Sequence, residues 1–224
     1  MRSSLLESIY LPTLENYSYS DARQFSRELD QKLGFQIDEI EQQILKNSPH
    51  TPWAGLDPQA LQTPYPEIRM MLSKLDLQFG QKIIDLGTGY GRMGLVIGHF
   101  YPEVEFTGYE VSTERVNEGR RILDKIGLDF ARAKSEGIQL LQADISSGGF
   151  EIPAVDVYFI YDFGDLESII RVIDQLKQIS MRQPIRVVGR GRRTRDHIER
   201  HEPWLSQVHP PVHCGNFSIY TTFT

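Results

Sequence analysis

Four glycines and one carboxylate occupy residues 83–94, IIDLGTGYGRMG, where a short apolar run ends. Glycine adopts left-handed backbone angles and lets a ligand approach the chain without meeting a Cβ. Free N–H groups at the start of a following helix favour anionic groups. The stretch therefore predicts a ligand-binding turn between a strand and a helix, with Asp85 at the end of the strand.

Two kinds of ligand compete for this turn. Gly89, Gly91 and Gly94 form GxGxxG, and Glu110 follows at about the distance of the acid that binds ribose in dinucleotide-binding proteins. This pattern favours a nicotinamide-dependent oxidoreductase. Asp85 argues against it, because a carboxylate at this edge opposes a pyrophosphate and suits a ligand with an ammonium group.

The surrounding segments predict a doubly wound α/β fold. From residue 81 onward strand-like runs alternate with helix-like runs, and several strands are apolar at consecutive positions, as in a parallel sheet covered on both faces. Two final strand-like runs joined near Gly215 predict an antiparallel hairpin, so the mostly parallel sheet has seven strands. We expect the first five strands at 82–86, 103–110, 137–143, 154–161 and 184–189, with helices at 92–101, 112–136 and 165–180.

The residues before the sheet predict a helical extension. Apolar residues recur at spacings of three and four over Ser20–Lys46, which indicates an amphipathic helix that Gly34 can interrupt. Five prolines within 47–66 exclude a long helix or a central strand there. We expect a helical N-terminal extension with a proline-rich lid or linker over 1–64, and the sheet domain over 65–224.

The glycine-rich turn resembles that of the class I (Rossmann-like) S-adenosylmethionine-dependent methyltransferases. Their pattern of two apolar residues, an acid, an apolar residue and GxGxG is matched by residues 83–91, and the resemblance extends over 81–224. It implies S-adenosyl-L-methionine as methyl donor and S-adenosyl-L-homocysteine as product. It also implies a donor site that includes Asp85, Gly87, Thr88, Gly89 and Gly91.

The resemblance implies two further acids in the donor site. An acid ends the second strand in that family and holds both ribose hydroxyls, and Glu110 stands at this place in FTGYEVS. Another acid follows the third strand near the adenine, where LLQADI offers Asp144 with Ile145. Val111 either packs on the adenine or closes the core. The residues alone also allow Glu110 to be a surface acid before a helix, and Asp144 to be a turn residue.

The segment that leads into the sheet domain is a candidate lid. TPYPEIRMML, residues 63–72, loosely resembles the segment that reaches the donor in methyltransferases that act on protein lysines without a SET domain. This likeness implies a donor contact from Tyr65. Together with Trp53 and the prolines it favours a lid, and plain linker packing is the alternative.

The end of the fourth strand is where we look for the methyl acceptor. Methyl transfer depends on alignment and on a site free of water. YFIYDFGDLES places Asp162 where it can bind an incoming amine or hydroxyl, and Tyr161 where it can wall the methyl channel. Amino-directed relatives have prolines after this acid, so Phe163 weakens a nucleobase-amine assignment. Asp165 is expected to cap the next helix.

Arginines follow the fifth strand in GRGRRTRDHIERHE. Arginine forks match carboxylate or phosphate, so Arg190, Arg192 and Arg193 indicate either an acidic or phosphorylated acceptor or a solvated helix face. The net charge of −6 disfavours binding of nucleic acid through bulk charge. A single cysteine offers no disulfide framework, and no metal site is expected.

The sequence lacks an apolar run long enough to span a membrane and lacks the apolar core of a secretory signal, so a cytoplasmic location is expected. The predicted function is methyl transfer from S-adenosylmethionine to an unknown acceptor, either a protein side chain such as lysine or a small molecule. A catalytically silent donor-binding or interaction module is an alternative of another class. A nicotinamide-dependent oxidoreductase is disfavoured by Asp85.

Overall fold

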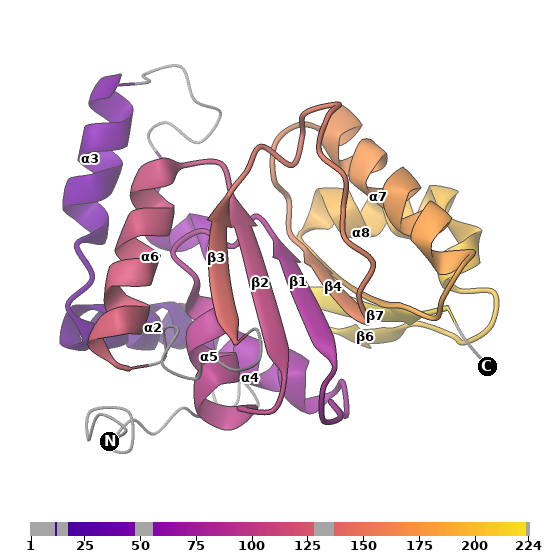
Figure 1. The fold of residues 1–224 in the computed structure, drawn as a ribbon, viewed down its shortest axis with the longest axis horizontal. Helices are drawn as coiled ribbons and strands as arrows, with labels where there is room; N and C mark the ends of the chain where they lie inside the picture. Colours follow the sequence, from indigo (N-terminus) through magenta and orange to yellow (C-terminus); the bar gives the residue numbers. More distant parts are fainter. Residues whose placement is uncertain (1–11, 13–17, 48–55, 128–136, 223–224) are drawn as a thin grey trace.

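The computed structural model describes residues 12, 18–47, 56–127 and 137–222. Seven strands form one sheet in the order β3-β2-β1-β4-β5-β7-β6 (Figure 1). The first five strands are parallel, and β7 pairs antiparallel with β5 and β6. This confirms the predicted sheet and its C-terminal hairpin. The strands are β1 (Lys82–Leu86), β2 (Glu105–Glu110), β3 (Ile138–Gln142), β4 (Val157–Ile160), β5 (Arg186–Arg190), β6 (Val212–Cys214) and β7 (Phe217–Thr221).

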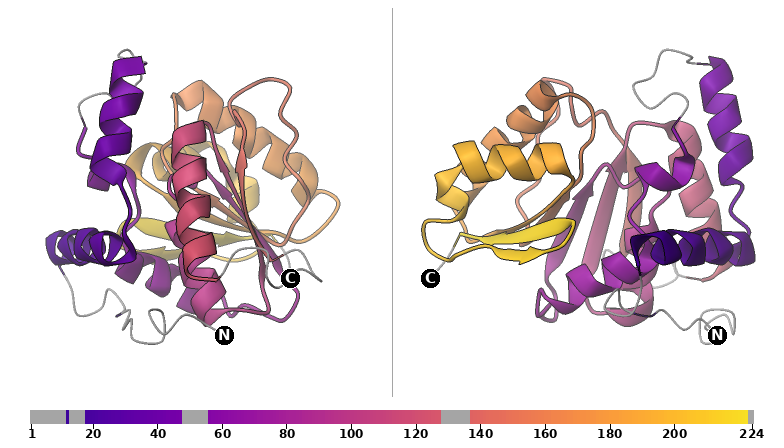
Figure 2. Two further views of the ribbon diagram at one scale, coloured as in Figure 1. Left: turned by 60° about the vertical axis from the view of Figure 1, so that its left-hand side comes forward. Right: turned by 180° about the vertical axis from the view of Figure 1, so that it is seen from behind.

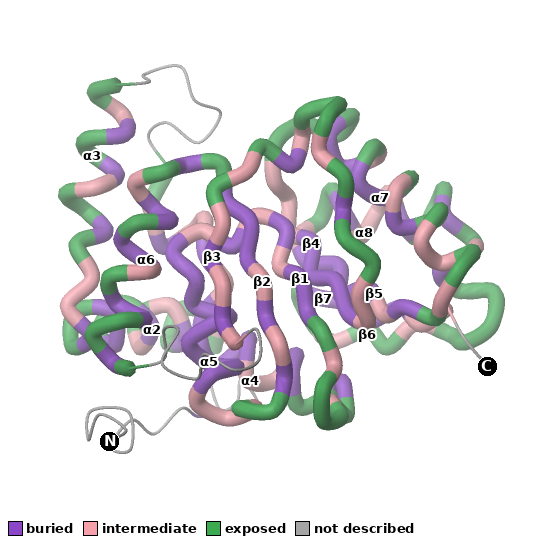
Figure 3. The backbone as a smooth tube through the Cα atoms, in the orientation of Figure 1, coloured by how far each residue is buried: buried purple, intermediate pink, exposed green. Residues whose placement is uncertain are grey.

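Helices cover both faces of the sheet (Figures 1 and 2). Successive strand residues point to opposite faces, so Ile83 belongs to one buried cluster and Ile84 to the other. One face packs against α4 (Tyr65–Ser73), α5 (Arg92–Phe100) and α6 (Thr113–Lys125). The other packs against α7 (Leu166–Ser180) and α8 (Arg192–His201). The central strand β4 and most of α5 are buried (Figure 3).

Most expected boundaries differ from the observed ones by a few residues. The helix expected at 112–136 ends at Lys125 as α6, and residues 128–136 lie outside the described part of the chain. Gly127 follows with φ +70, a left-handed angle that ends a helix. The cap expected from Asp165 is confirmed, because its carboxylate accepts a hydrogen bond from Ser168 N at 2.8 Å.

In the described part of the N-terminal extension there are two helices and a short 3-10 turn. Gly34 has φ +84 and ends α2 (Tyr19–Leu33), and α3 (Ile37–Asn47) follows at an angle in the two views of Figure 2. The stripe expected over residues 20–46 is therefore divided between two helices. Leu29 and Leu33 of α2 join the same buried cluster as the sheet. The turn η2 (Pro58–Leu61) leads into α4.

None of the described helices is long and apolar enough to cross a membrane.

Candidate functional site

The glycine-rich turn joins β1 to α5 and is tied to β2. The backbone N–H groups of Gly87 and Thr88 both donate to Tyr109 O at 2.9 Å. Gly87, Gly89 and Gly91 have φ values of +95, +59 and +79, which residues with a side chain rarely adopt. A Cβ on Gly91 would lie 2.6 Å from Leu140 Cδ1, so this glycine also allows α5 to approach β3.

A cavity of about 40 Å³ opens beside this turn. It lies between the ends of β1 and β4, where the strand order reverses and where open α/β sheets bind their ligands. From the predicted donor and acceptor residues it brings together Asp85, Gly87, Thr88, Gly89, Tyr161 and Arg190. Its remaining walls are Leu61, Gln62, Thr63, Ile68, Met71, Arg92, Met93, Phe159, Ile160 and Val188.

Asp85 is the acidic group of the cavity. It lies in β1 beside Gly108 of β2 and Phe159 of β4. Burial raises the pKa of its carboxyl to about 7, against a smaller lowering by Thr88 and with a further rise from Glu110. No basic residue of the described chain neutralises it. A carboxylate in this setting is stabilised by a ligand that brings a positive charge.

Glu110 ends β2 and reaches the glycine-rich turn from the other side. One carboxylate oxygen accepts from Gly89 N at 3.0 Å and the other from Ser112 N at 3.0 Å. Arg115 Nη1 lies 3.5 Å from it. Only 6% of Glu110 is exposed. Glu110 therefore adjoins the cavity through Gly89, and each of its carboxylate oxygens accepts from a backbone N–H group.

Three residues predicted for the outer end of the donor lie apart from this cavity. Val111 is exposed, whereas Ile145 is buried in the cluster on the α7 side of the sheet. Asp144 is exposed and accepts hydrogen bonds from Ser146 N at 2.9 Å and Ser146 Oγ at 2.5 Å. This is the turn geometry that the sequence allowed as an alternative for Asp144.

Tyr65 lies in the core rather than on the cavity wall. Its exposed fraction is 1%, and its hydroxyl donates to Asp30 Oδ1 at 2.9 Å. Burial and the neighbouring Asp30 raise the pKa of this hydroxyl well above its usual value. Trp53, the other half of the predicted lid, lies outside the described residues.

Asp162 and Tyr161 follow β4 with different roles. The Asp162 carboxylate accepts from Arg193 N at 3.1 Å and Thr194 N at 2.8 Å, so it caps α8. Tyr161 lies on the cavity wall, and its hydroxyl donates to Ala60 O at 3.3 Å. Of the predicted catalytic pair, Tyr161 lines the cavity and Asp162 is engaged with the backbone of α8.

The three arginines predicted for the acceptor have separate surroundings. Arg190 is buried, forms a two-pronged pair with Glu67 at 3.0 and 3.1 Å, and stacks on Tyr161 at 4.1 Å from the ring centroid. Arg193 donates to Gly164 O at 2.7 Å. Arg192 is exposed. The buried ion pair with Glu67 thus neutralises the charge of Arg190 inside the protein.

A second cavity of about 360 Å³ borders the first across Tyr161 and Arg190. Its volume falls in the range of small-molecule sites. α8 lines it with charges of both signs at positions 192, 195, 196 and 199, a spacing that places them on one side of a helix. Tyr19 of α2, Gly191 and Asn216 complete the lining.

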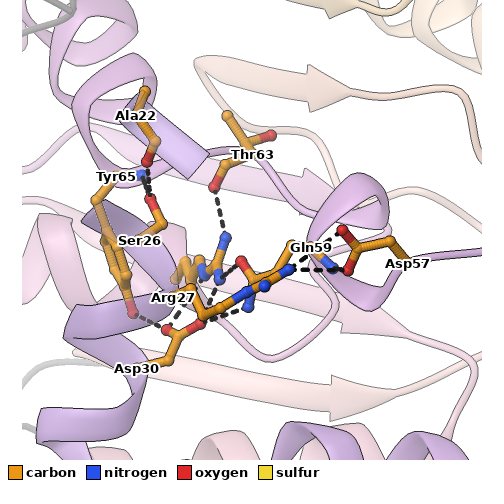
Figure 4. Close-up of polar contacts among 9 residues, drawn as sticks. Ala22, Ser26, Arg27, Asp30, Asp57, Gln59, Thr63 and Tyr65 are labelled. Atoms are coloured by element: carbon orange, nitrogen blue, oxygen red, sulfur yellow. Dashed lines mark hydrogen bonds and ion pairs between the residues drawn. The ribbon is translucent and has the colours of Figure 1, made fainter. Parts of the chain in front are cut away.

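Arg92 and its partners are absent from the residues predicted for the site. Arg92 follows the glycine-rich turn, and its guanidinium pairs with Asp30 of α2 and donates to Gln59 Oε1 at 2.6 Å. It also donates to Thr63 O at 3.3 Å, so the ring of contacts around Asp30 in Figure 4 joins the extension to the turn. The only sequence signal for this contact is an arginine directly after Gly91.

The comparisons with known proteins agree with this geometry. Residues 67–146 match the model of the methyltransferase small domain. An RNA methyltransferase from Salinibacter ruber, solved with S-adenosyl-L-homocysteine, is 20% identical with a TM-score of 0.50 over 71% of this chain and 90% of its own. No curated protein matches the chain.

Two further solved structures match with lower TM-scores. The precorrin-6Y C5,15-methyltransferase from Geobacter metallireducens is 19% identical, with a TM-score of 0.49 over 73% of this chain and 90% of its own. YcgJ from Bacillus subtilis is 19% identical with a TM-score of 0.41, and the match covers 55% of this chain and half of YcgJ. The domain match over residues 67–146 and the order of the strands show that this chain has the Rossmann-like fold of the class I S-adenosylmethionine-dependent methyltransferases.

Proposed function

We propose that this protein transfers a methyl group from S-adenosylmethionine to an acceptor, with the donor bound beside the glycine-rich turn. The observation that carries the proposal is Asp85, a carboxylate with a raised pKa at the strand edge where this fold binds its ligand, with no basic partner among the described residues. The donor has an ammonium group that complements this charge. A dinucleotide would place a pyrophosphate at the same turn and would be repelled.

The residues present fit this donor. Gly87 and Gly89 give the turn left-handed angles without side chains, and both line the cavity. Asp85 would hold the ammonium group, and Glu110 would hold the ribose after giving up part of its contact with Gly89 N. Arg115 forms an ion pair with this carboxylate, with its Nη1 3.5 Å from Glu110 Oε1. When bound, the donor supplies an electrophilic methyl group on a sulfonium.

Tyr161 and Arg190 form the boundary between donor and acceptor in this proposal. They line both cavities, and their stacked side chains limit the access of water from the second cavity to the first. The acceptor enters through the second cavity and reaches the donor past Tyr161. Asp162 positions α8, and hence this cavity, through its bonds to Arg193 N and Thr194 N.

The acceptor is either a protein side chain, such as lysine, or a small molecule. With the Asp162 carboxylate taken up by α8, we propose that the acceptor brings its own lone pair or loses its proton to solvent. Arg190 is buried and paired with Glu67. An acidic or phosphorylated acceptor would therefore be bound by Arg192, which is exposed although it lies 3.5 Å from Asp196. Action in the cytoplasm is part of the same proposal.

The test is transfer of label from S-adenosylmethionine with a radioactive methyl group. The protein is incubated with the donor and a fractionated lysate, and label is followed into protein, RNA and small molecules. Asp85→Asn is the matched control. We expect label in protein or in a small molecule with the wild type and not with the control.

A second candidate function is a silent module that binds the donor. The contacts of Asp162 favour it, because two backbone N–H groups of α8 already donate to the carboxylate that was expected to bind the acceptor. Binding of S-adenosylmethionine without label in any fraction would support this candidate and contradict methyl transfer.

A further inference from the structure

One wall of the donor cavity comes from the N-terminal extension. Leu61, Gln62 and Thr63 lie opposite the glycine-rich turn, and a Cβ on Gly89 would be 3.8 Å from Gln62 Cγ. The extension therefore reaches the donor cavity directly through the segment that follows η2.

Gln62 is the polar residue of this segment without a partner. Only 7% of it is exposed, and its buried Nε2 has no hydrogen-bond partner in the described part of the chain. Leaving a buried amide donor unpaired costs roughly 1–3 kcal/mol. Burying a polar group at that cost, on the wall of a cavity, is typical of a group that pairs with a ligand.

Asp85 is in the same cavity and has the complementary chemistry. Among the residues that the structure describes, Asp85 offers a carboxylate with no basic partner, whereas Gln62 offers an N–H donor with no acceptor. A ligand that carries an ammonium group and a carboxylate close together satisfies both. The amino-acid end of S-adenosylmethionine has these two groups on one carbon.

We propose that the side-chain amide of Gln62 donates a hydrogen bond to the carboxylate of the donor's amino-acid end, while Asp85 takes its ammonium group. This inference rests on the proposed function and adds a donor-binding residue from outside the sheet. It also gives the described part of the extension a role in the site, that of a wall which completes the donor pocket.

The contacts around Asp30 hold Gln62 in place. Asp30 and Arg92 form an ion pair with 4% and 3% of their side chains exposed. Arg92 also donates hydrogen bonds to a residue before Gln62 and to the residue after it. These bonds go to Gln59 Oε1 at 2.6 Å and to Thr63 O at 3.3 Å. Gln59 Nε2 donates back to Asp30 at 3.2 Å (Figure 4). Arg92 and Asp30 are therefore positioning residues for Gln62.

Tyr65, at the start of α4, is held by residues of the same helix α2 that carries Asp30. Tyr65 N donates to Ser26 Oγ at 3.0 Å, and Tyr65 Oη donates to Asp30 Oδ1 at 2.9 Å. Before it, Asp57 caps η2 by accepting from Gln59 N at 2.9 Å. Gln62 thus lies between two points that are anchored to the folded core.

The experiment compares two ligands that differ only at the amino-acid end. Calorimetry measures S-adenosylhomocysteine, which has this end, and 5′-methylthioadenosine, which lacks it. Gln62→Met removes the N–H at similar volume, and Gln43→Ala on the exposed side of α3 is the control. We expect Gln62→Met to weaken S-adenosylhomocysteine about tenfold, in line with a hydrogen bond to a charged group, and to change methylthioadenosine less than twofold.

Gln62→Glu sharpens the test by facing the carboxylate with a negative charge. It should weaken S-adenosylhomocysteine more than Gln62→Met does. Equal losses for both ligands, unchanged affinity, or tighter binding by Gln62→Glu would overturn the assignment. A wild-type protein that binds neither ligand would instead overturn the proposed function, so the two failures are distinguishable.

Discussion

Asp85 and Asp162 are both aspartates at the carboxyl ends of neighbouring strands, β1 and β4. Asp162 has a structural role, because two backbone N–H groups of α8 donate to its carboxylate. Asp85 has no basic partner in the described chain, and burial raises the pKa of its carboxyl to about 7. The same residue type therefore has a structural role at one edge position and is available to a ligand at the next.

The difference between the two carboxylates lies in what stabilises their charge. A capped carboxylate stabilises the fold by satisfying donors at a helix start. An uncompensated one destabilises the ligand-free protein, since it is held where its charged form is disfavoured. Binding of a cation beside the carboxylate offsets this loss of stability.

The largest effect is expected from Asp85→Asn. Loss of the charge should weaken S-adenosylmethionine about 100-fold, as expected for a charge-assisted hydrogen bond of about 3 kcal/mol. Calorimetry measures the affinity, and thermal unfolding shows whether the variant remains folded. If the variant binds the donor as tightly as the wild type does, Asp85 does not hold the donor's ammonium group.

Asp162→Ala should act on stability. Loss of a helix cap lowers the free energy of unfolding by about 1–2 kcal/mol, and Asp162→Ser should recover part of this because serine also caps helices. Denaturant unfolding measures both variants. Donor affinity should stay within twofold of the wild type. Unchanged stability combined with lost methyl transfer would instead make Asp162 a catalytic residue.

The pH dependence follows from the raised pKa of Asp85. Donor binding needs its charged form, so affinity should fall about tenfold between pH 8 and pH 6, and Asp85→Asn should abolish this dependence. Unfolding of the donor-free protein should show the opposite sign. Because the folded pKa exceeds the unfolded value, the contribution of Asp85 to stability is present at low pH and is lost as pH rises through about 7.

The smallest effect is expected from Asp144→Ala. The Asp144 side chain is exposed and bonded within its own turn to Ser146, away from the donor cavity. Donor affinity should change less than threefold by calorimetry. A tenfold loss would show that the turn after β3 closes on the adenine, as the family resemblance implies.

The sequence predicted features that depend on nearby residues. The strand before Asp85, the glycine-rich turn and the Asp165 cap each depend on residues within a few positions, and the structure has all three. The Asp162 cap joins positions 31 and 32 residues apart. Local spacing carries no signal for such a pair, so Asp162 was interpreted as catalytic.

The wall formed by Gln62 was also beyond prediction. Its position depends on the pair between Asp30 and Arg92, which are 62 residues apart and charged, so apolar periodicity does not detect them. Charged residues of this kind are usually exposed, so their burial as an ion pair is visible only in the folded structure.

A calorimetric titration of S-adenosylhomocysteine and NADH into the wild-type protein at pH 8 tests the role of Asp85 in donor binding most directly. Asp85 is then charged, and we expect saturable binding of S-adenosylhomocysteine to one site and no binding of NADH. Binding of NADH without S-adenosylhomocysteine would show that the glycine-rich turn holds a dinucleotide and would contradict the role given to Asp85.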